Sequence, residues 1–289
     1  MHVSLDSALG RQRRLNSVGE SVLQIAPNAK AAYSLRSLTG GDPKVVRVRR
    51  DTGGGAGDND EEDFTASGIS SGALVDFVGS GNDGFVDTWY DQSGNGNDAE
   101  QATAANQPKI VSSGSLVPDD GIDFDGGDFL VASSVSGLNS PFSIFSTSVR
   151  DATGYIGSFS KSTASNRFFA VQEGSSTSIA VPRNATSGVS VSASVSGSDR
   201  LAFALTTGKT STSVGAKGGT LANTTDDYGS DFTSVSGLDQ LAIGVHRTVS
   251  PSGYFNGRIR ELIFYTSDQT ANRSAVETNT ANYYNITLV

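Results

Sequence analysis

Short strand-like runs separated by turn residues recur along most of this chain. From about residue 72 to residue 265, apolar runs alternate with clusters of Gly, Ser, Asn and Asp, the residues that favour turns. Leu201, Phe203 and Leu205 alternate with other residues, as in a strand that buries one face. The pattern predicts an all-β protein. The clearer runs are Phe85 to Tyr90, Gly121 to Asp125, Asp128 to Ala132, Phe142 to Val149, Arg167 to Gln172, Arg200 to Thr206, Leu241 to His246 and Gly253 to Tyr265.

Composition agrees with many short strands. The 289 residues include 34 glycines, and only 18% of the residues are charged. Such a composition suits strands and turns better than packed helices. Because single β-sandwiches of about 200–250 residues are common, the length allows one large domain or two smaller ones.

Charge and residue usage exclude several classes of function. The formal net charge of -9 disfavours nucleic-acid binding, because phosphate contacts need clustered Lys and Arg. Without cysteine, neither a disulfide nor a thiolate metal site can form. No apolar stretch approaches the roughly 18 residues of a membrane span, and no signal-peptide-like segment follows Met1. We expect a protein that is neither membrane-inserted nor exported by the usual route.

The only tryptophan begins the most distinctive stretch of the chain, residues 89–98. Trp89 and Tyr90 end a strand-like run and bring large side chains to bury. Gly94 and Gly96 follow, and glycine tolerates the positive φ angles of a tight reversal. The stretch therefore predicts a buried anchor, Trp89, that leads into a turn.

This stretch resembles the signature of a known family. Tyr-Asp-Gln-Ser-Gly-Asn-Gly-Asn at residues 90–97, followed by Gln107-Pro108-Lys109-Ile110, is similar to the fungal α-L-arabinofuranosidase B catalytic domain and to many tailed-phage virion proteins. Both groups are concanavalin A-like (laminin-G-like) β-sandwiches. The resemblance implies a two-sheet antiparallel concanavalin A-like (jelly-roll) sandwich, and a shared fold does not fix an activity.

Both ends of the chain fit this domain. Residues 31–36 and 45–50 resemble its opening, and residues 261–265 with the segment after them resemble its close in the phage type. Ser267 or Asp268 can cap a terminal helix of about 14 residues. We therefore predict a domain over residues 31–289 that ends in a short C-terminal helix. The stripe of that helix is Val276, Thr280, Tyr283 and Tyr284.

Residues 1–30 differ from the rest and are predicted to form an N-terminal arm. Arg11, Arg13 and Arg14 cluster there, among apolar residues such as Leu15 and Val18. Two interpretations stay open: a flexible terminus, or an anchor that orders only against another subunit. Because phage proteins of this type have similar arms, the resemblance favours an anchor that attaches residues 1–30 to other virion proteins. It also implies a homo-oligomer.

A glycine-rich loop with an acidic end spans residues 51–63. Asp58, Asp60 and Asp63 could offer oxygen ligands to Ca²⁺, but their spacing lacks the EF-hand pattern. A solvated acidic loop is the simpler interpretation of residues 58–63, and calcium binding stays open. The glycines lack the lysine of a phosphate-binding loop, so nucleotide binding is not predicted.

The family resemblance implies retaining hydrolysis by a glutamate nucleophile and an aspartate acid/base. The family's Asp-x-Glu-Asn-Asn stretch and its vicinal cysteine pair are absent from this sequence. Its Ile-Gly-Gly-Asp strand is best matched by Ile243-Gly244-Val245-His246, which puts His246 at the carboxylate position. Glu173 is the nearest candidate for a carboxylate on a mid-chain strand. We therefore predict that the chain has no catalytic residues and is not an enzyme.

The sequence also lacks residues that a Ser-His-Asp triad or a zinc site would need. A Ser-His-Asp triad would need His246 as its base, because the other histidine, His2, lies in the arm, and no Gly-x-Ser-x-Gly elbow is present. Two separated histidines without cysteine make a zinc site hard to assemble. Neither a metal site nor a cofactor is predicted.

Glycan binding is the activity that the residues support. Sugar recognition uses aromatic rings and polar side chains on loops of a rigid scaffold. The candidate glycan-binding residues are Tyr155, Tyr228, His246, Arg247 and Tyr254, which lie in or near glycine-rich turns. The alternative is that these tyrosines cover the core.

The combined prediction is a non-enzymatic bacteriophage virion structural protein, made in the host cytoplasm. It would be a capsid decoration, neck, tail or fibre component that is attached through its N-terminal arm, with host-surface polysaccharide as its candidate ligand. The alternative is a glycoside hydrolase of the arabinofuranosidase type or a free carbohydrate-binding module.

Overall fold

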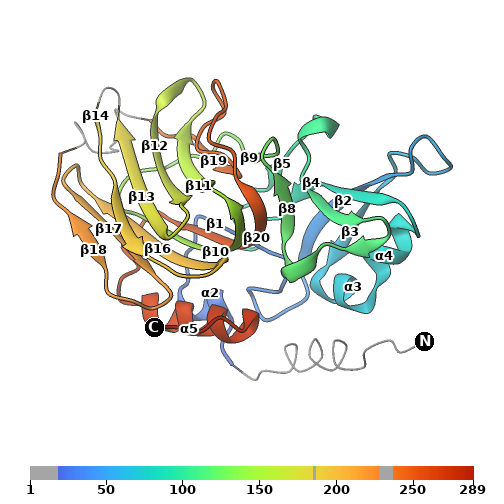
Figure 1. Cartoon of the computed structure of the whole chain (residues 1–289), viewed down its shortest axis with the longest axis horizontal. Coiled ribbons are helices and arrows are strands. Elements are labelled where there is room, and N and C mark those ends of the chain that lie inside the picture. Colours follow the sequence, from blue (N-terminus) through green and yellow to red (C-terminus); the bar gives the residue numbers. More distant parts are fainter. Residues whose placement is uncertain (1–18, 185–186, 228–236) are drawn as a thin grey trace.

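Two antiparallel sheets face each other, and a smaller β-rich lobe extends them at one end (Figure 1). The computed structural model describes residues 19–184, 187–227 and 237–289. Within these ranges every strand pairing is antiparallel, which confirms the predicted all-β sandwich. No helix in the described part of the chain is both long and apolar enough to cross a membrane.

The first sheet continues from the sandwich into the lobe. Its strand order is β15–β13–β12–β11–β19–β9–β5–β4–β2–β3, and β14 extends the hairpin of β13. The bounds are β2 Lys44–Asp51, β3 Glu61–Thr65, β4 Asp83–Trp89, β5 Ala99–Glu100, β9 Leu130–Ala132, β11 Gly154–Lys161, β12 Ala164–Glu173, β13 Thr177–Asn184, β14 Ser187–Gly188, β15 Val191–Ser194 and β19 Gln240–Ile243.

The second sheet has the order β18–β17–β16–β10–β20–β1. Strands β6 and β8 join the two sheets inside the lobe, because β4 pairs with β6, β6 with β8, and β8 with β20. The bounds are β1 Ala31–Ser34, β6 Lys109–Ser112, β7 Ser115–Leu116, β8 Ile122–Asp125, β10 Phe142–Ala152, β16 Asp199–Thr207, β17 Ser211–Ala216, β18 Ala222–Thr224 and β20 Asn256–Tyr265. Two short 3-10 helices, Ala104–Asn106 and Pro118–Asp120, lie in the lobe connections.

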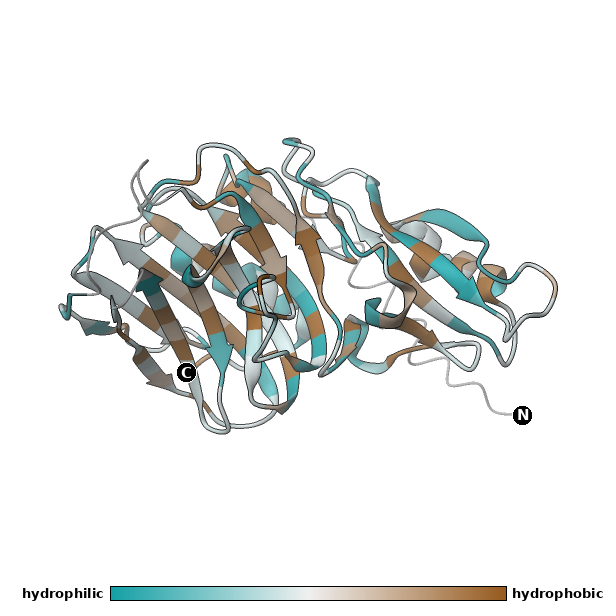
Figure 2. Cartoon of the chain, turned by 90° about the horizontal axis from the view of Figure 1, so that it is seen from above, coloured by the Kyte–Doolittle hydropathy of each residue, from teal (hydrophilic) through white to brown (hydrophobic). Residues whose placement is uncertain are grey.

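An aromatic layer holds the two sheets together. Phe142 of β10 lies 4.3 Å, between ring centroids, from Phe159 of β11, and Phe159 lies 5.1 Å from Phe264 of β20. All three side chains are fully buried. Apolar and polar residues alternate along the strands (Figure 2), as expected where one face of each sheet is inside.

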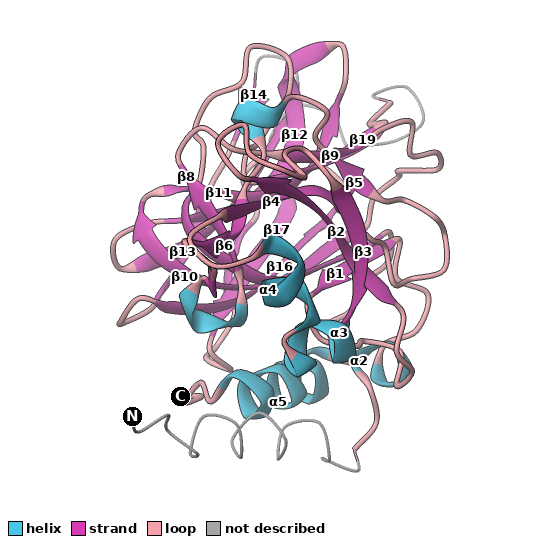
Figure 3. Cartoon of the chain, turned by 90° about the vertical axis from the view of Figure 1, so that its right-hand side faces the viewer, coloured by secondary structure: helices cyan, strands magenta, loops and turns pink. Residues whose placement is uncertain are grey.

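The outer side of the second sheet is covered by two helices, α2 (Val22–Ile25) and α5 (Arg273–Tyr284) (Figure 3). Val22 and Val276 pack with Phe203 and Ile263 of the sheet, and all four are buried. The Tyr265 hydroxyl donates to the Ala26 carbonyl at 2.7 Å. The described part of the predicted arm, residues 19–30, therefore packs on the domain, and the division at residue 30 stays a prediction.

The terminal helix is present but begins later than predicted. α5 spans Arg273–Tyr284, and its N-cap is Asn272, not Ser267 or Asp268. Those two residues belong to the preceding turn, where the Ser267 carbonyl accepts from the Ser143 hydroxyl and the Asp268 carboxylate accepts from the backbone of Thr270. The Asp268 side chain is thus bonded within this turn, and the helix begins only at Arg273.

The acidic loop and the segment after it contain regular structure that the sequence did not predict. The end of the predicted loop forms β3, in which Asp63 lies opposite Arg47 of β2 and accepts from its guanidinium at 2.8 Å. Two short helices follow, α3 (Ala66–Ser71) and α4 (Ala73–Val78), joined at Gly72 with φ of 93°. Ion pairs with β2 thus stabilise β3 as a strand, although its sequence is highly charged.

Trp89 is fully buried, as predicted. Its ring centroid lies 5.8 Å from that of Tyr33 on β1. The turn that follows binds the start of the domain through hydrogen bonds. Asp91 accepts from the backbone of Ala32 at 2.9 Å, and the Tyr33 hydroxyl donates to the carbonyl of Asn97. We call residues 91–98 the signature turn.

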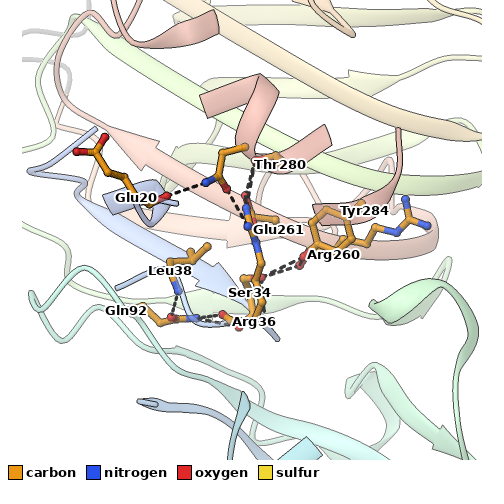
Figure 4. Close-up of polar contacts among 10 residues, drawn as sticks. Glu20, Ser34, Arg36, Leu38, Gln92, Arg260, Glu261, Thr280 and Tyr284 are labelled. Carbon is orange, nitrogen blue, oxygen red and sulfur yellow. Dashed lines mark hydrogen bonds and ion pairs between the residues drawn. The ribbon is translucent and has the colours of Figure 1, made fainter. Parts of the chain in front are cut away.

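Gln92 is the most buried polar side chain of the signature turn, and we predict that Gln92→Leu destabilises the fold. Its amide accepts from Leu38 N at 2.7 Å and donates to the carbonyls of Ser34 and Arg36 at 2.9 Å (Figure 4). Leucine leaves these buried groups without partners, which costs about 2–4 kcal/mol of unfolding free energy. Urea denaturation of both proteins measures the loss. The control, Gln172→Leu at a half-exposed site on β12, should change stability by less than about 1 kcal/mol; equal effects would contradict the argument.

Candidate functional site

Three aromatic side chains gather on the outer side of the first sheet. The centroid of the Tyr155 ring on β11 lies 4.3 Å from that of the His246 imidazole, and Phe168 of β12 lies 4.7 Å from His246 and 6.2 Å from Tyr155. We call Tyr155, Phe168 and His246 the aromatic cluster. It joins two of the predicted glycan-binding residues, Tyr155 and His246.

Strand alternation decides which side chains surround the cluster. Along β12, Phe169 and Val171 are in the core between the sheets, so Phe168 and Gln172 point outward. On β13, the cross-strand partners of these outward residues are Arg183, opposite Phe168, and Ile179, opposite Gln172. The outward positions of β11, β12 and β13 form what we call the outer face, and they are Tyr155, Ser158, Ser160, Phe168, Ala170, Gln172, Ile179, Val181 and Arg183.

The connection from Gly244 to Phe255, which we call the loop 244–255, covers one side of the cluster. Gly253 sits directly on Tyr155: with φ of +66°, it would bring a Cβ to 2.7 Å from Tyr155 Cδ2. The backbone N–H of Tyr155 donates to the Gly253 carbonyl at 3.0 Å. Only glycine fits this close approach without a shift.

Arg247 and Tyr254, also predicted to bind glycans, lie in this loop but have other contacts. The Arg247 guanidinium donates to the carbonyls of Ser250 and Ser165 and to the Ser252 hydroxyl, at 3.1, 2.9 and 2.8 Å. It therefore holds the loop against β12. Tyr254 packs on Phe129, 6.2 Å between centroids, so it lies away from the aromatic cluster.

The remaining predicted site residues lie outside the described residues. These are Tyr228 in the candidate glycan site and Arg11, Arg13 and Arg14 in the arm.

The electrostatics of the outer face are positive, in a chain of net charge -9. Burial lowers the pKa of His246 to about 4, and the Arg247 and Arg183 guanidiniums lower it further. Burial raises the pKa of Tyr155, although the same two guanidiniums act to lower it. At neutral pH the imidazole is therefore uncharged, and the positive charge near the cluster comes from arginine.

Glu173, the candidate carboxylate of the sequence, faces the core instead of this surface. It is fully buried; its Oε2 accepts from the Ser178 hydroxyl at 2.8 Å and lies 3.4 Å from the Arg200 guanidinium. Burial raises the pKa of Glu173 to about 7. Its role is an ion pair between the sheets, and it offers no carboxylate to a ligand on the outer face.

Asp128, which the sequence did not single out, carries a buried carboxyl group and lies near the start of the loop 244–255. Asp128 follows β8 and is only 6% exposed. Its Oδ2 accepts from the backbone of Asp125 at 3.0 Å. Burial raises the pKa of Asp128 to about 7, and the neighbouring Asp125 carboxylate adds to the shift. The Asp128 carbonyl also packs against Gly244, where the loop begins.

The acidic loop residues are engaged with protein groups. Asp58 accepts from the backbone of Thr52 at 2.9 Å, Asp60 pairs with Arg50, and Asp63 pairs with Lys44 and Arg47. Within the described ranges, no three His, Asp or Glu side chains are grouped as a metal site would require.

A cavity of about 460 Å³ lies beside α5. It is bounded by residues 19–21, by α3, by the β6–β8 region and by α5. Its charged lining residues are Glu20, Arg36, Asp42 and Asp120. We call it the α5 cavity. Its volume is in the range of small-molecule pockets, but it lies apart from the aromatic cluster in the fold.

Solved structures share this fold. An arabinofuranosidase complexed with arabinofuranosyl-α-1,2-xylobiose matches with a TM-score of 0.66 at 14% identity, over 91% of this chain and 64% of its own. A GH54 α-L-arabinofuranosidase soaked with a cyclic sulfate inhibitor matches with a TM-score of 0.66 at 15% identity, over 89% of this chain and 63% of its own. The chain thus spans less than two thirds of these enzymes. No protein-family model matches it, and no curated protein matches its sequence.

These matches confirm one prediction and overturn another. The predicted likeness to the arabinofuranosidase sandwich is confirmed as a likeness of fold. The prediction that the chain is not an enzyme is contradicted, because glycoside hydrolases share the fold of about nine tenths of it. That prediction relied on missing motifs, and catalytic groups can come from other positions of the same scaffold. At 14–15% identity the likeness shows the fold alone.

Proposed function

We propose that this protein recognises anionic glycans on the outer face, around the aromatic cluster. The observation that carries the proposal is a half-buried tyrosine ring beside an uncharged imidazole and an exposed guanidinium, Arg183, on a carbohydrate-active type of sandwich. None of the outward residues of β11, β12 and β13 named above is acidic. An anionic sugar would therefore meet cations and no opposing carboxylate from these strands.

Each group on the outer face has a role in this proposal. The Tyr155 ring offers an apolar surface for the C–H face of a sugar ring. Gln172 and His246 can donate to or accept from hydroxyl groups, since the imidazole stays neutral above about pH 4. Arg183 can bind a sugar carboxylate with two parallel N–H donors.

Arg183→Gln should weaken the binding of uronate-containing oligosaccharides about tenfold, which corresponds to the roughly 1.4 kcal/mol lost with one charge-assisted hydrogen bond. Isothermal titration with a uronate oligosaccharide and with its carboxyl-reduced, neutral counterpart measures the effect. Neutral sugar should bind the wild type and the variant equally. The control is Lys217→Gln, which removes a cation that donates to Ser196 instead. Equal affinity of wild type and Arg183→Gln for the uronate would contradict the anionic preference, and failure of Tyr155→Ala to weaken either sugar would contradict the site.

Glycoside hydrolysis is the second candidate function, and Asp128 is the residue that favours it. A glycosidase needs a carboxyl group that is still protonated near neutral pH to protonate the leaving oxygen. Asp128 has a pKa of about 7 through burial, and the exposed Asp125 carboxylate lies three residues before it. In this proposal the burial of Asp128, and not a sequence motif, identifies it as the acid.

If Asp128 is the acid, hydrolysis of 4-nitrophenyl α-L-arabinofuranoside should be fastest below pH 7. Activity should fall as the pH rises through about 7, because the acid then loses the proton that it must donate. Asp128→Asn should lower kcat/KM by about 10²–10⁴-fold, whereas Asp76→Asn, an exposed change on α4, should not. Release of nitrophenol from pH 4 to 9 measures both. A rate unchanged by Asp128→Asn would exclude this residue as the acid.

The virion location and the attachment through residues 1–30 stay proposals, supported by the likeness of residues 90–97 and 261–265 to phage virion proteins. If the protein is a virion component, mass spectrometry should find it in purified particles. A phage whose gene lacks the codons for residues 2–18 should then make the protein but leave it out of the particle. Its presence in both kinds of particle would show that attachment lies elsewhere.

A further inference from the structure

A second pair of aromatic side chains, Phe129 and Tyr254, is not used by the proposed site. Their ring centroids are 6.2 Å apart, and both side chains are half-buried. Phe129 directly precedes β9, whose Leu130 and Ala132 are in the core between the sheets. Since side chains alternate along an extended chain, Phe129 points to the outer side of the first sheet, the side that carries the aromatic cluster.

The backbone holds this pair in a fixed position. The N–H of Phe129 donates to the Asn106 carbonyl at 3.2 Å, and the Phe129 carbonyl accepts from the buried Gln101 amide at 2.9 Å. Tyr254 is followed by Phe255, which is fully buried. Both rings therefore project from backbone that is fixed before a ligand arrives, and fixed groups lose little freedom on binding.

One short segment of the loop 244–255 contacts both groups of rings. Gly253 packs on Tyr155 of the aromatic cluster, and the next residue, Tyr254, packs on Phe129. Consecutive Cα atoms are only about 3.8 Å apart. The two aromatic surfaces are therefore neighbours on the sheet, and a short oligosaccharide can contact both.

The two aromatic surfaces differ in the charge around them. The segments that contain the pair or bond to it are residues 99–106, 125–132 and 248–255, and their charged side chains are Glu100, Asp125 and Asp128. Glu100 is exposed, and its cross-strand partner Val131 lies two residues after Phe129. The aromatic cluster has instead the guanidiniums of Arg183 and Arg247 close by. Charge complementarity therefore favours an anionic sugar at the cluster and an uncharged sugar at the pair.

We propose that Phe129 and Tyr254 form a second sugar-binding surface, for an uncharged sugar that is linked to the anionic one. This inference rests on the proposed function, and it narrows the ligand to an oligosaccharide that contains both uronate and neutral sugars. The two rings offer apolar surface to the C–H face of the neutral sugar. Glu100 and Asp125 repel a second carboxylate there, so a chain made only of uronates fits less well.

Three probes built on the same uronate test this surface. They are methyl glucuronide, a hyaluronan tetrasaccharide, in which glucuronate alternates with N-acetylglucosamine, and a tetrasaccharide of glucuronate alone. NMR titration of the full chain measures each Kd. The wild type should bind the alternating tetrasaccharide about tenfold more tightly than methyl glucuronide, because the aromatic pair adds contacts. Tyr254→Ala should remove most of this gain and leave the affinity for methyl glucuronide unchanged.

Two further variants separate the loss of the ring from damage to the loop. Tyr254→Phe keeps the ring and should bind all three probes as the wild type does. Phe129→Ala should repeat the effect of Tyr254→Ala while the sequence of the loop 244–255 stays intact. It decides the case if Tyr254→Ala weakens every probe.

Glu100→Gln tests the charge argument. It should tighten the binding of the all-glucuronate tetrasaccharide by about twofold to fivefold, as expected for one exposed charge, and leave methyl glucuronide unaffected. This gain should shrink at 0.5 M NaCl, because salt screens exposed charges. The control is Glu62→Gln at an exposed site on β3, which should change neither affinity.

The outcomes separate this inference from the proposed function. Equal affinity of the wild type for methyl glucuronide and the alternating tetrasaccharide would overturn the second surface and leave the proposed function standing. An alternating tetrasaccharide that binds Phe129→Ala and Tyr254→Ala as tightly as the wild type would do the same. If no probe binds, or if Arg183→Gln leaves the affinity for methyl glucuronide unchanged, the proposed function fails as well.

Discussion

The hydrogen bonds of the signature turn hold the first strand in place, and much of the molecule depends on them. Strand β1 pairs only with β20 among the described strands, so one edge of it has no ladder partner. Asp91 binds the backbone of Ala32 on that edge, and Gln92 binds three backbone groups between Ser34 and Leu38. Side chains thus replace a neighbouring strand, which satisfies buried backbone groups that would otherwise be costly.

Strand β1, which the signature turn holds in place, also connects the turn to the terminal helix α5. Once β1 is fixed on β20, Arg36 reaches Glu261 of β20 and Asn279 of α5 together. The hydroxyl of Tyr284 on α5 donates to the Arg260 carbonyl at 3.2 Å (Figure 4). Removing one partner of such a buried ion pair is far more costly than the pair itself is stabilising. The motif that carries the predicted resemblance is therefore a structural device in this chain, and such a device does not fix an activity.

The sequence predicted the strands that alternate clearly and missed those that do not. The runs in β10, β16 and β20 are apolar enough to be recognised, and Trp89 was correctly expected to be buried. β3 was missed because its charges are matched only across the pair with β2, and α3 and α4 because each is a single short helix of six residues. Tyr155 and His246 were both predicted as glycan-binding residues, but the contact between them depends on the pairing of β11 with β19, which the sequence did not predict. Asp128 was not predicted at all, because its raised pKa comes from burial, which no local pattern records.

The same reasoning explains why a comparison of motifs misses carboxyl groups whose pKa is raised by burial. At the position where the predicted resemblance would put an acid/base carboxylate, this chain has His246, whose pKa burial lowers to about 4. A neutral imidazole there cannot donate a proton as an imidazolium would, so that position is suited to binding. A carboxyl group with a pKa of about 7 belongs instead to Asp128, whose backbone carbonyl packs against Gly244 at the start of the loop 244–255. The ability of a residue to transfer a proton depends on its surroundings, so burial can give a carboxyl group a raised pKa at a position that carries no motif.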